Sequence, residues 1–129
     1  MIKTPAASPQ ELIKRVEKGV PFRDLEVLGR KLHLTLDELS RLVGIARATL
    51  HRRRKEGRLQ PMESDRLVRY ERLLAQAIKV FESEEDALGW LRAAQRGLGG
   101  AVPLEYAQTE VGAREVERLL GRIEYGVYS

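Results

Sequence analysis

The chain has 129 residues, of which 43% are hydrophobic and only 5% aromatic, and its net charge is +4. This length predicts one domain or two very small ones, with a core built mainly from Leu, Val, Ile and Ala. The absence of cysteine excludes disulfide bonds, thiolate catalysis and cysteine-ligated zinc.

The charge is distributed unevenly along the chain. Residues 1–60 carry 14 Lys and Arg against 7 Asp and Glu, whereas residues 61–129 carry 9 against 12. A basic first half and a mildly acidic second half suggest two partners of different charge. The sequence has no apolar run near the ~20 residues of a membrane span and begins without a signal peptide's apolar stretch. We therefore expect a cytoplasmic protein without a membrane partner.

Two helices are expected before residue 33. The capping box Ser8-Pro9-Gln10-Glu11 predicts the start of the first helix, which Gly19 ends. Its apolar side is expected to consist of Leu12, Ile13 and Val16. Pro21 opens the second helix, and the residues expected to face inward are Phe22, Leu25, Leu28 and Leu32.

The stretch Leu36–Arg54 predicts two short helices joined by a sharp turn. Thr35 and Glu38 form a second capping box, and Gly44 supplies the left-handed conformation that a tight turn requires. Small Ser40 and aliphatic Leu50 stand where a helix-turn-helix needs a close crossing and a buried plug. The pattern therefore predicts a helix-turn-helix, although an ordinary helical corner would share some of these features.

The second helix of this pair is strongly basic. Its outer face, which enters the DNA major groove in this motif, comprises Arg47, Ala48, His51, Arg52 and Lys55. Arg47 lies nearest the helix start and is our candidate for reading a base edge. The alternative is that the basic run is only a solvated face.

The remaining chain predicts further helices and no convincing strand. A long helix is expected from about Pro61–Ser64 to about Glu82, followed by one that Ser83 and Asp86 cap. A short helix begins at Val102-Pro103-Leu104, and a last helix runs from about Ala113 to Tyr125. Trp90 is expected in the core, and the residues expected to shape turns are Gly99, Gly100, Pro103 and Gly112.

Motifs for catalysis or cofactor binding are absent from the sequence. Gly97-Leu98-Gly99 lacks the third glycine of a dinucleotide fingerprint, because that position is Val102, and we expect a loop there. His33 and His51 are isolated from metal-spaced partners. The acids around a helix start stabilise its dipole; they are Glu82, Glu84, Glu85 and Asp86. We expect a protein that is not an enzyme and has no metal or cofactor.

Four motifs in the second half carry a family resemblance. They are ALGWL at Ala87–Leu91, LGGAVPL at Leu98–Leu104, TEVG at Thr109–Gly112 and LGRIEYGVY at Leu120–Tyr128. Together they resemble the antitoxins of RES–Xre toxin–antitoxin pairs, the MbcA/ParS/Xre family. The recognition-helix region Ala48–Arg53 is similar to the same family, which adds Thr49 and Arg53 to the candidate DNA-binding residues. The resemblance covers about residues 19–129.

This resemblance implies an all-α protein with a helix-turn-helix DNA-binding half followed by a small helical toxin-binding half. The expected parts are an N-terminal extension at 1–18, the helix-turn-helix at 19–62, a connecting helix at 63–83 and the toxin-binding domain at 84–129. The partners would be operator DNA and a RES-domain toxin that consumes NAD, which is the toxin's substrate. The C-terminal end would cover the toxin's active-site opening through Arg122, Ile123, Glu124, Tyr125, Val127 and Tyr128.

Other functions remain open at this point. A one-component regulator would use the second half only for dimerisation, and a structural adaptor would not bind DNA. The basic helix-turn-helix argues against the adaptor. Helix-turn-helix repressors are by default two-fold symmetric dimers, so we expect a homodimer.

Overall fold

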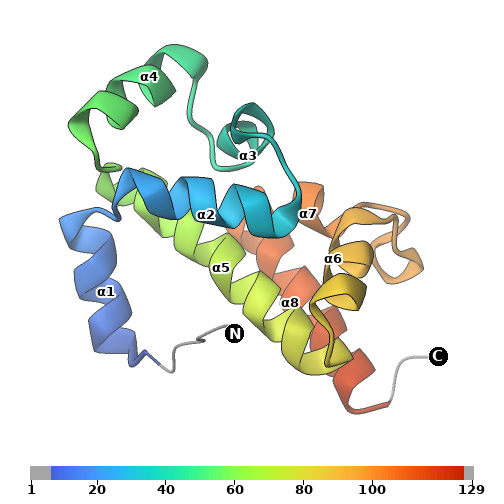
Figure 1. The fold of residues 1–129 in the computed structure, drawn as a ribbon. Helices are drawn as coiled ribbons and strands as arrows, with labels where there is room; N and C mark the ends of the chain where they lie inside the picture. The colour runs from blue at the N-terminus through green and yellow to red at the C-terminus, as the bar shows by residue number, and fades with distance from the viewer. Residues whose placement is uncertain (1–6, 127–129) are drawn as a thin grey trace. The chain divides into compact units, whose positions relative to one another are not determined.

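A computed structural model of the chain describes residues 7–126 (Figure 1). Within that range the regular structure consists of eight α-helices and one 3-10 helix, with only two isolated bridges of extended chain. The predicted all-α fold is confirmed. No helix between residues 7 and 126 is long and apolar enough to cross a membrane. The chain forms two compact units, Met1–Val68 and Arg69–Ser129.

The N-terminal unit contains four helices and the start of a fifth. They are α1 (Pro9–Lys18), α2 (Phe22–Leu32), α3 (Leu36–Leu42), α4 (Arg47–Glu56) and the first residues of α5 (Pro61–Phe81). Both predicted capping boxes are present, since the hydroxyls of Ser8 and Thr35 each accept a hydrogen bond from the backbone N–H three residues on. The expected helix end at Gly19 is also confirmed, and α4 ends at Gly57, which has a left-handed conformation.

The two first helices differ in how well their apolar sides were predicted. The four inward residues of α2 are all buried, as expected. In α1 the expectation is wrong for Ile13, which is 55% exposed, while Leu12 and Val16 are half-buried. Leu12 and Val16 stand four positions apart on one stripe, whereas Ile13 is turned about 100° away from Leu12. The apolar stripe of α1 is narrow, and an ion pair at 2.8 Å between Arg15 of α1 and Asp24 of α2 provides a further contact between the two helices.

The turn between α3 and α4 has the backbone conformation that the sequence predicts. Gly44 has a φ of 73°, in the left-handed region that favours glycine. The N–H of Ile45 donates to the Ser40 carbonyl at 2.8 Å, which closes the turn. Val43 and Ile45, on either side of the glycine, are both buried. This geometry fixes where α4 begins and therefore which of its side chains reach solvent.

Two connecting segments of the N-terminal unit pair with one another. The Leu59 N–H donates to the Val20 carbonyl, and the Phe22 N–H donates to the Gly57 carbonyl, each at 2.9 Å. The Val20 N–H in turn donates to the buried hydroxyl of Ser64 at 2.9 Å. These bonds satisfy buried backbone groups where the chain leaves α1 and where it leaves α4.

The C-terminal unit packs the rest of α5 against the helices that follow it. These are α6 (Glu84–Arg92), the 3-10 helix η1 (Arg96–Leu98), α7 (Pro103–Tyr106) and α8 (Glu110–Glu124). The hydroxyl of Tyr70 donates to the Leu104 carbonyl at 2.8 Å, and the Gln76 amide donates to the Glu117 carbonyl at 3.1 Å. The apolar core of this unit includes Leu73, Ala77, Leu91, Val116, Leu119 and Leu120.

Three expectations for this unit are wrong. The last helix begins at Glu110 rather than about Ala113, because the Thr109 hydroxyl caps it by accepting from the Gly112 N–H at 3.0 Å. Gly112 therefore lies in the first turn of α8 and does not shape a loop. Trp90 is half-buried, with its ring 5.8 Å from that of Phe81, so it borders the core without being enclosed by it.

The position of Gly112 allows α7 and α8 to approach closely. A Cβ at this residue would lie 1.8 Å from the backbone carbonyl oxygen of Tyr106, and a rigid backbone cannot yield as a side chain can. Gly121 in the same helix has nothing within 4 Å of the corresponding point. A change of glycine to alanine at each site therefore distinguishes the effect of close helix packing on stability from the effect of helix propensity.

We expect Gly112→Ala to lower the free energy of unfolding by about 1–3 kcal/mol, because the two helices must move apart. Gly121→Ala should be neutral or stabilise by roughly 0.5–1 kcal/mol, since alanine loses less backbone entropy in a helix. Urea unfolding followed by circular dichroism measures both. Equal stability of the two variants would contradict the close approach.

Candidate DNA-binding and partner-binding surfaces

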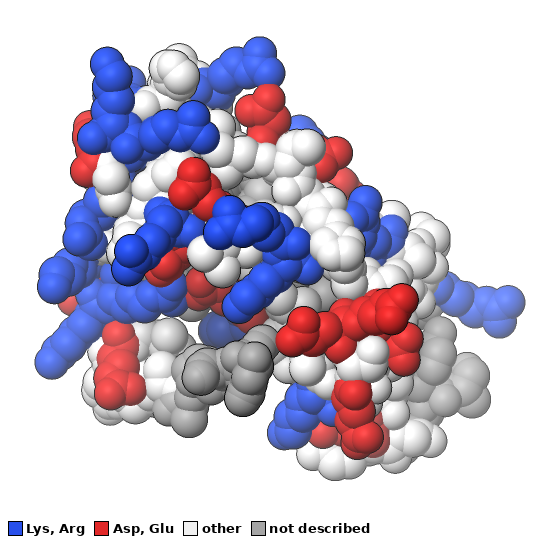
Figure 2. Space-filling model, in the orientation of Figure 1, with Lys and Arg blue, Asp and Glu red and all other residues white. Residues whose placement is uncertain are grey.

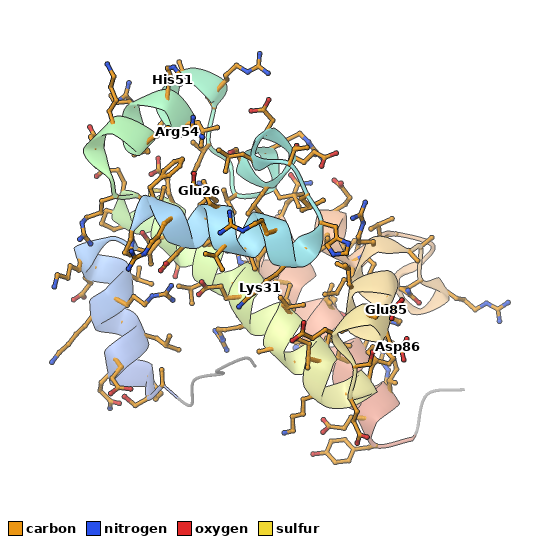
Figure 3. All side chains as sticks on the ribbon, in the orientation of Figure 1. Glu26, Lys31, His51, Arg54, Glu85 and Asp86 are labelled. Carbon is orange, nitrogen blue, oxygen red and sulfur yellow. The ribbon has the colours of Figure 1, made fainter. Side chains whose placement is uncertain are left out.

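The outer face of α4 presents the basic residues that the sequence singled out. The five residues expected there are exposed, and they are Arg47, Ala48, His51, Arg52 and Lys55. Figure 2 shows Lys and Arg side chains gathered over α4, and Figure 3 shows His51 on the outer side of that helix. Thr49, added by the family resemblance, is half-buried. A convex helix with several outward cations is suited to a groove lined by phosphates.

Arg53 lies apart from these residues. Its side chain is only 11% exposed, and its Nε donates to the Glu63 carboxylate at 2.8 Å. A second contact joins it to Glu56 at 3.3 Å. The hydrogen bond to Glu63 raises the pKa of the Arg53 guanidinium. The structure therefore places Arg53 between α4 and the start of α5, and not on the outer face.

Arg54 leans toward α2, although its side chain is still 54% exposed. Its guanidinium carbon lies 5.6 Å from the centre of the Phe22 ring, and an Nη atom lies 3.9 Å from the Glu26 carboxylate. Figure 3 shows Arg54 and Glu26 on the facing sides of their helices. The sequence contains a signal for this arrangement that was missed. Positions three and four residues after buried Leu50 share its face of the helix, so Arg53 and Arg54 are expected on the side of α4 that packs against the rest of the unit.

Arg47 is held from outside its own helix. Its Nη2 donates to the Asp37 Oδ2 of α3 at 2.8 Å, although the two side chains are 85% and 58% exposed. The hydrogen bond and the charge of Asp37 raise the pKa of Arg47. An ion pair this open to solvent contributes little to the free energy of unfolding. The sequence assigned no role to Asp37, because the capping box of Thr35 and Glu38 already explained the start of this helix.

An open depression lies between the start of α3 and the outer part of α4. Its volume is about 390 Å³, and its lining consists of Thr35, Leu36, Asp37, Arg47, Leu50, His51 and Arg54. Within residues 7–126, no group of three or more His, Asp or Glu side chains could hold a metal ion. Gly97 and Leu98 lie in η1, and Gly99 is its C-cap. The segment thus belongs to the connection between α6 and α7, where a loop was expected. The depression beside Arg47 is thus open to solvent and lined by charged, polar and apolar side chains.

The end of α8 exposes three of the residues expected to bind a partner, which are Arg122, Glu124 and Tyr125. Tyr125, at the C-cap, is 79% exposed, and Arg122 is also exposed. Ile123 is half-buried, and Glu124 lies 3.9 Å from Lys79. Val127 and Tyr128 lie outside the described residues. Tyrosine and arginine are enriched among the residues that contribute most of the binding energy in protein interfaces. Both residue types are exposed at this helix end.

An acidic surface occurs at the start of α6. Glu84, Glu85 and Asp86 occupy its first turn, and the Ser83 hydroxyl accepts a hydrogen bond from the Asp86 N–H at 3.0 Å. On the face drawn in Figure 2, acidic side chains gather at this point. The carboxylates stabilise the positive end of the helix dipole, as the sequence predicts.

Comparison with known proteins assigns a description to each half. Residues 11–72 match a family model described as "Antitoxin Xre-like helix-turn-helix domain". Residues 76–126 match one described as "Antitoxin Xre/MbcA/ParS C-terminal toxin-binding domain". The first match takes in most of α1, which the sequence resemblance had left unassigned. The two matches fall on either side of a short interval within α5.

Whole-length relatives agree with these matches. An "Antitoxin Xre" of Yersinia enterocolitica is 32% identical over 130 residues, which cover 99% of this chain and 88% of the relative. An "Antitoxin Xre" of Photorhabdus laumondii is 30% identical over 127 residues, covering 97% and 86%. A Sphingobium protein named "Prs ADP-ribosylating antitoxin" is 27% identical over 135 residues, covering 95% and 84%.

The neighbouring residues Arg52 and Arg53 should respond differently to the same substitution. Arg53→Ala leaves the Glu63 carboxylate without its partner in a largely buried place, so we expect a loss of about 1–3 kcal/mol in the free energy of unfolding. Arg52→Ala removes an exposed side chain and should change it by less than about 0.5 kcal/mol. Urea unfolding monitored by circular dichroism distinguishes them. Stability equal to the parent in Arg53→Ala would show that the inner contact is unimportant.

Proposed function

The chain belongs to the Xre family of antitoxins, and we propose that it neutralises a RES-domain toxin encoded beside it and represses their shared operon. The family has a helix-turn-helix domain and a toxin-binding domain, which match successive parts of this chain. The observation that carries the proposal is that each half also presents its own exposed surface. One is the outer face of α4, and the other is the end of α8.

We assign operator binding to the outer face of α4. The proposed contacts are Arg47, Ala48, Thr49, His51, Arg52 and Lys55, and Arg53 is proposed instead to hold the helix in place. The exposed cationic side chains along one face of α4 are suited to pairing with the phosphates that border a major groove. A homodimer would place two such helices on the two halves of a symmetric operator. Occupying an operator that overlaps the promoter would block transcription.

We assign toxin binding to the last turn of α8 and the residues that follow it. The supporting observation is the exposure of Tyr125 and Arg122 at a helix end. The proposed contacts also include Ile123 and Glu124, together with Val127 and Tyr128 beyond the described residues. A tyrosine ring entering an apolar opening excludes water, while an adjacent arginine can pair with an acid at the rim. Such an element would close the entrance of the toxin's active site.

The proposed toxin consumes NAD. The family resemblance implies a RES-domain partner, and one relative's name associates an antitoxin with ADP-ribosylation. In that reaction NAD supplies the ADP-ribosyl group, so both point to the same substrate. The antitoxin itself needs no catalytic group for this role, because covering the entrance is sufficient. NAD is thus the partner's substrate, and we propose no cofactor for this chain.

The DNA-binding surface should be separable from toxin neutralisation. We expect the triple variant Arg47→Ala, Arg52→Ala, Lys55→Ala to lose at least about tenfold in affinity for the operon's upstream DNA, because phosphate contacts supply much of such affinity. It should still protect cells from the neighbouring toxin. Fluorescence anisotropy with a labelled duplex and a growth assay measure the two activities. Undiminished DNA affinity in a folded triple variant would remove α4 from the proposal.

The reciprocal variant tests the end of α8. Arg122→Glu combined with Tyr125→Ala reverses one charge and removes one exposed ring, and a binding hot spot contributes roughly 2 kcal/mol or more. We expect it to lose toxin capture and to permit toxin-driven NAD loss, while binding the upstream duplex like the parent. Pull-down and an NAD assay measure both effects.

A matched control makes the same chemical changes near the start of α8. Arg114→Glu with Tyr106→Ala alters an exposed arginine and an exposed tyrosine in the same unit. This control should still capture and silence the toxin. If the Arg122 and Tyr125 variant is folded and neutralises as well as the control, the end of α8 is not the neutralising element.

A further inference from the structure

We propose that Asp37 of α3 is a positioning residue for DNA sequence discrimination, acting through the guanidinium of Arg47. This inference rests on the proposed operator binding and adds to it a residue outside α4. Its basis is the 2.8 Å hydrogen bond from Arg47 Nη2 to Asp37 Oδ2, which joins the two helices of the motif at their exposed ends.

The pair lies where a base-reading side chain would need support. Arg47 is the first residue of α4, and Asp37 lies in the first turn of α3. A guanidinium carries five N–H donors in a rigid planar fork. The contact with Asp37 uses Nη2 and leaves further donors for the O6 and N7 acceptors of a guanine. One carboxylate thus fixes the plane of the fork without consuming it.

The helix dipole accounts for Asp37, which is an acid in the first turn of α3, but it does not account for Arg47 at the start of α4. A cation at a helix N-terminus is disfavoured by the helix dipole. The first turn of α4 contains no acidic residue, and its N-cap is Ala46, which has no side-chain acceptor. The acid that compensates for Arg47 comes instead from α3, in a pair largely open to solvent. The charge distribution is unfavourable for forming α4 but suited to holding one arginine ready for a ligand.

Asp37 would favour the correct sequence by orienting Arg47, at a cost in affinity that all sequences share. Holding the arginine before binding reduces the rotamer entropy that a base contact must otherwise remove. A negative charge beside the DNA surface also repels phosphates, and this penalty applies to every sequence. At the operator, the oriented contact with a base offsets the penalty. On unrelated DNA only the repulsion remains. Because the same repulsion acts on both sequences, it leaves the ratio of their affinities unchanged, and the gain in discrimination comes from the oriented Arg47 contact.

The test compares two duplexes by fluorescence anisotropy at one fixed salt concentration. One duplex is the region upstream of the gene that encodes this chain, and the other is a scrambled duplex of the same length and composition. Discrimination is the ratio of the two affinities. We expect Asp37→Asn, which keeps the side chain's shape, to bind the scrambled duplex more tightly and to reduce the ratio by roughly three- to tenfold.

A double-mutant cycle shows whether Asp37 acts through Arg47. Arg47→Ala alone should reduce the ratio by roughly five- to a hundredfold, as expected for one lost base contact. Adding Asp37→Asn to Arg47→Ala should reduce it no further. Glu17→Gln is the charge control, because it removes one exposed acid from α1 and should leave the ratio unchanged. Thermal melts confirm that all four variants are folded.

The possible failures are distinguishable. A parent chain that shows no preference for the upstream duplex overturns the proposed operator binding, and this inference with it. If the parent shows a preference, Asp37→Asn with the parent's ratio overturns the inference alone. An equal loss from Asp37→Asn in the parent and in Arg47→Ala also overturns it, because Asp37 would then act independently of Arg47.

Discussion

The carboxylate of Glu63 fixes the orientation of the basic helix. Its Oε1 accepts two hydrogen bonds, each at 2.8 Å. One comes from the Arg53 Nε and the other from the Gln60 backbone N–H. The same group therefore caps the start of α5 and holds α4 against it. Because the Arg53 and Glu63 side chains are each only 11% exposed, losing one partner would leave a poorly solvated charge. The outer face of α4 depends on this contact, since fixing one side of a helix also determines the opposite side.

The basic run of α4 consequently serves two purposes. Consecutive residues in a helix are about 100° apart, so a run of cations cannot remain on one face. Arg53 pairs with Glu63, and Arg54 lies over the Phe22 ring beside Glu26. Arg53 is thereby withdrawn from solvent, and Arg54, although 54% exposed, is directed toward α2 and away from the outer face. The number of positive charges in such a run therefore overstates the number of nucleic-acid contacts, and the salt dependence of binding should reflect the smaller set.

The fold was predictable where a local rule was sufficient. Both capping boxes and the positive φ of Gly44 depend on neighbours within a few residues, and the structure confirms them. The start of α8 was missed because Thr109 has Gly112 at the third helical position, where a capping box would have an acid or amide. The need for glycine at that position comes from the Tyr106 carbonyl, a close approach that sequence periodicity does not encode. The pairing of Arg53 with Glu63 was similarly hidden, because several other acids were equally plausible partners.

The two arginines proposed to contact partners are held by opposite electrostatic arrangements. Arg47 stands at the start of α4, where the dipole opposes a cation, and an acid from α3 compensates for it. Arg122 stands in the last turn of α8, where the dipole favours a cation without any acid from elsewhere. A base edge requires a fixed plane of donors, which a carboxylate can impose. A protein partner can supply its own acid and adapt its shape, so a helix end that merely retains the charge is sufficient. This difference in support matches the difference between reading DNA and covering another protein.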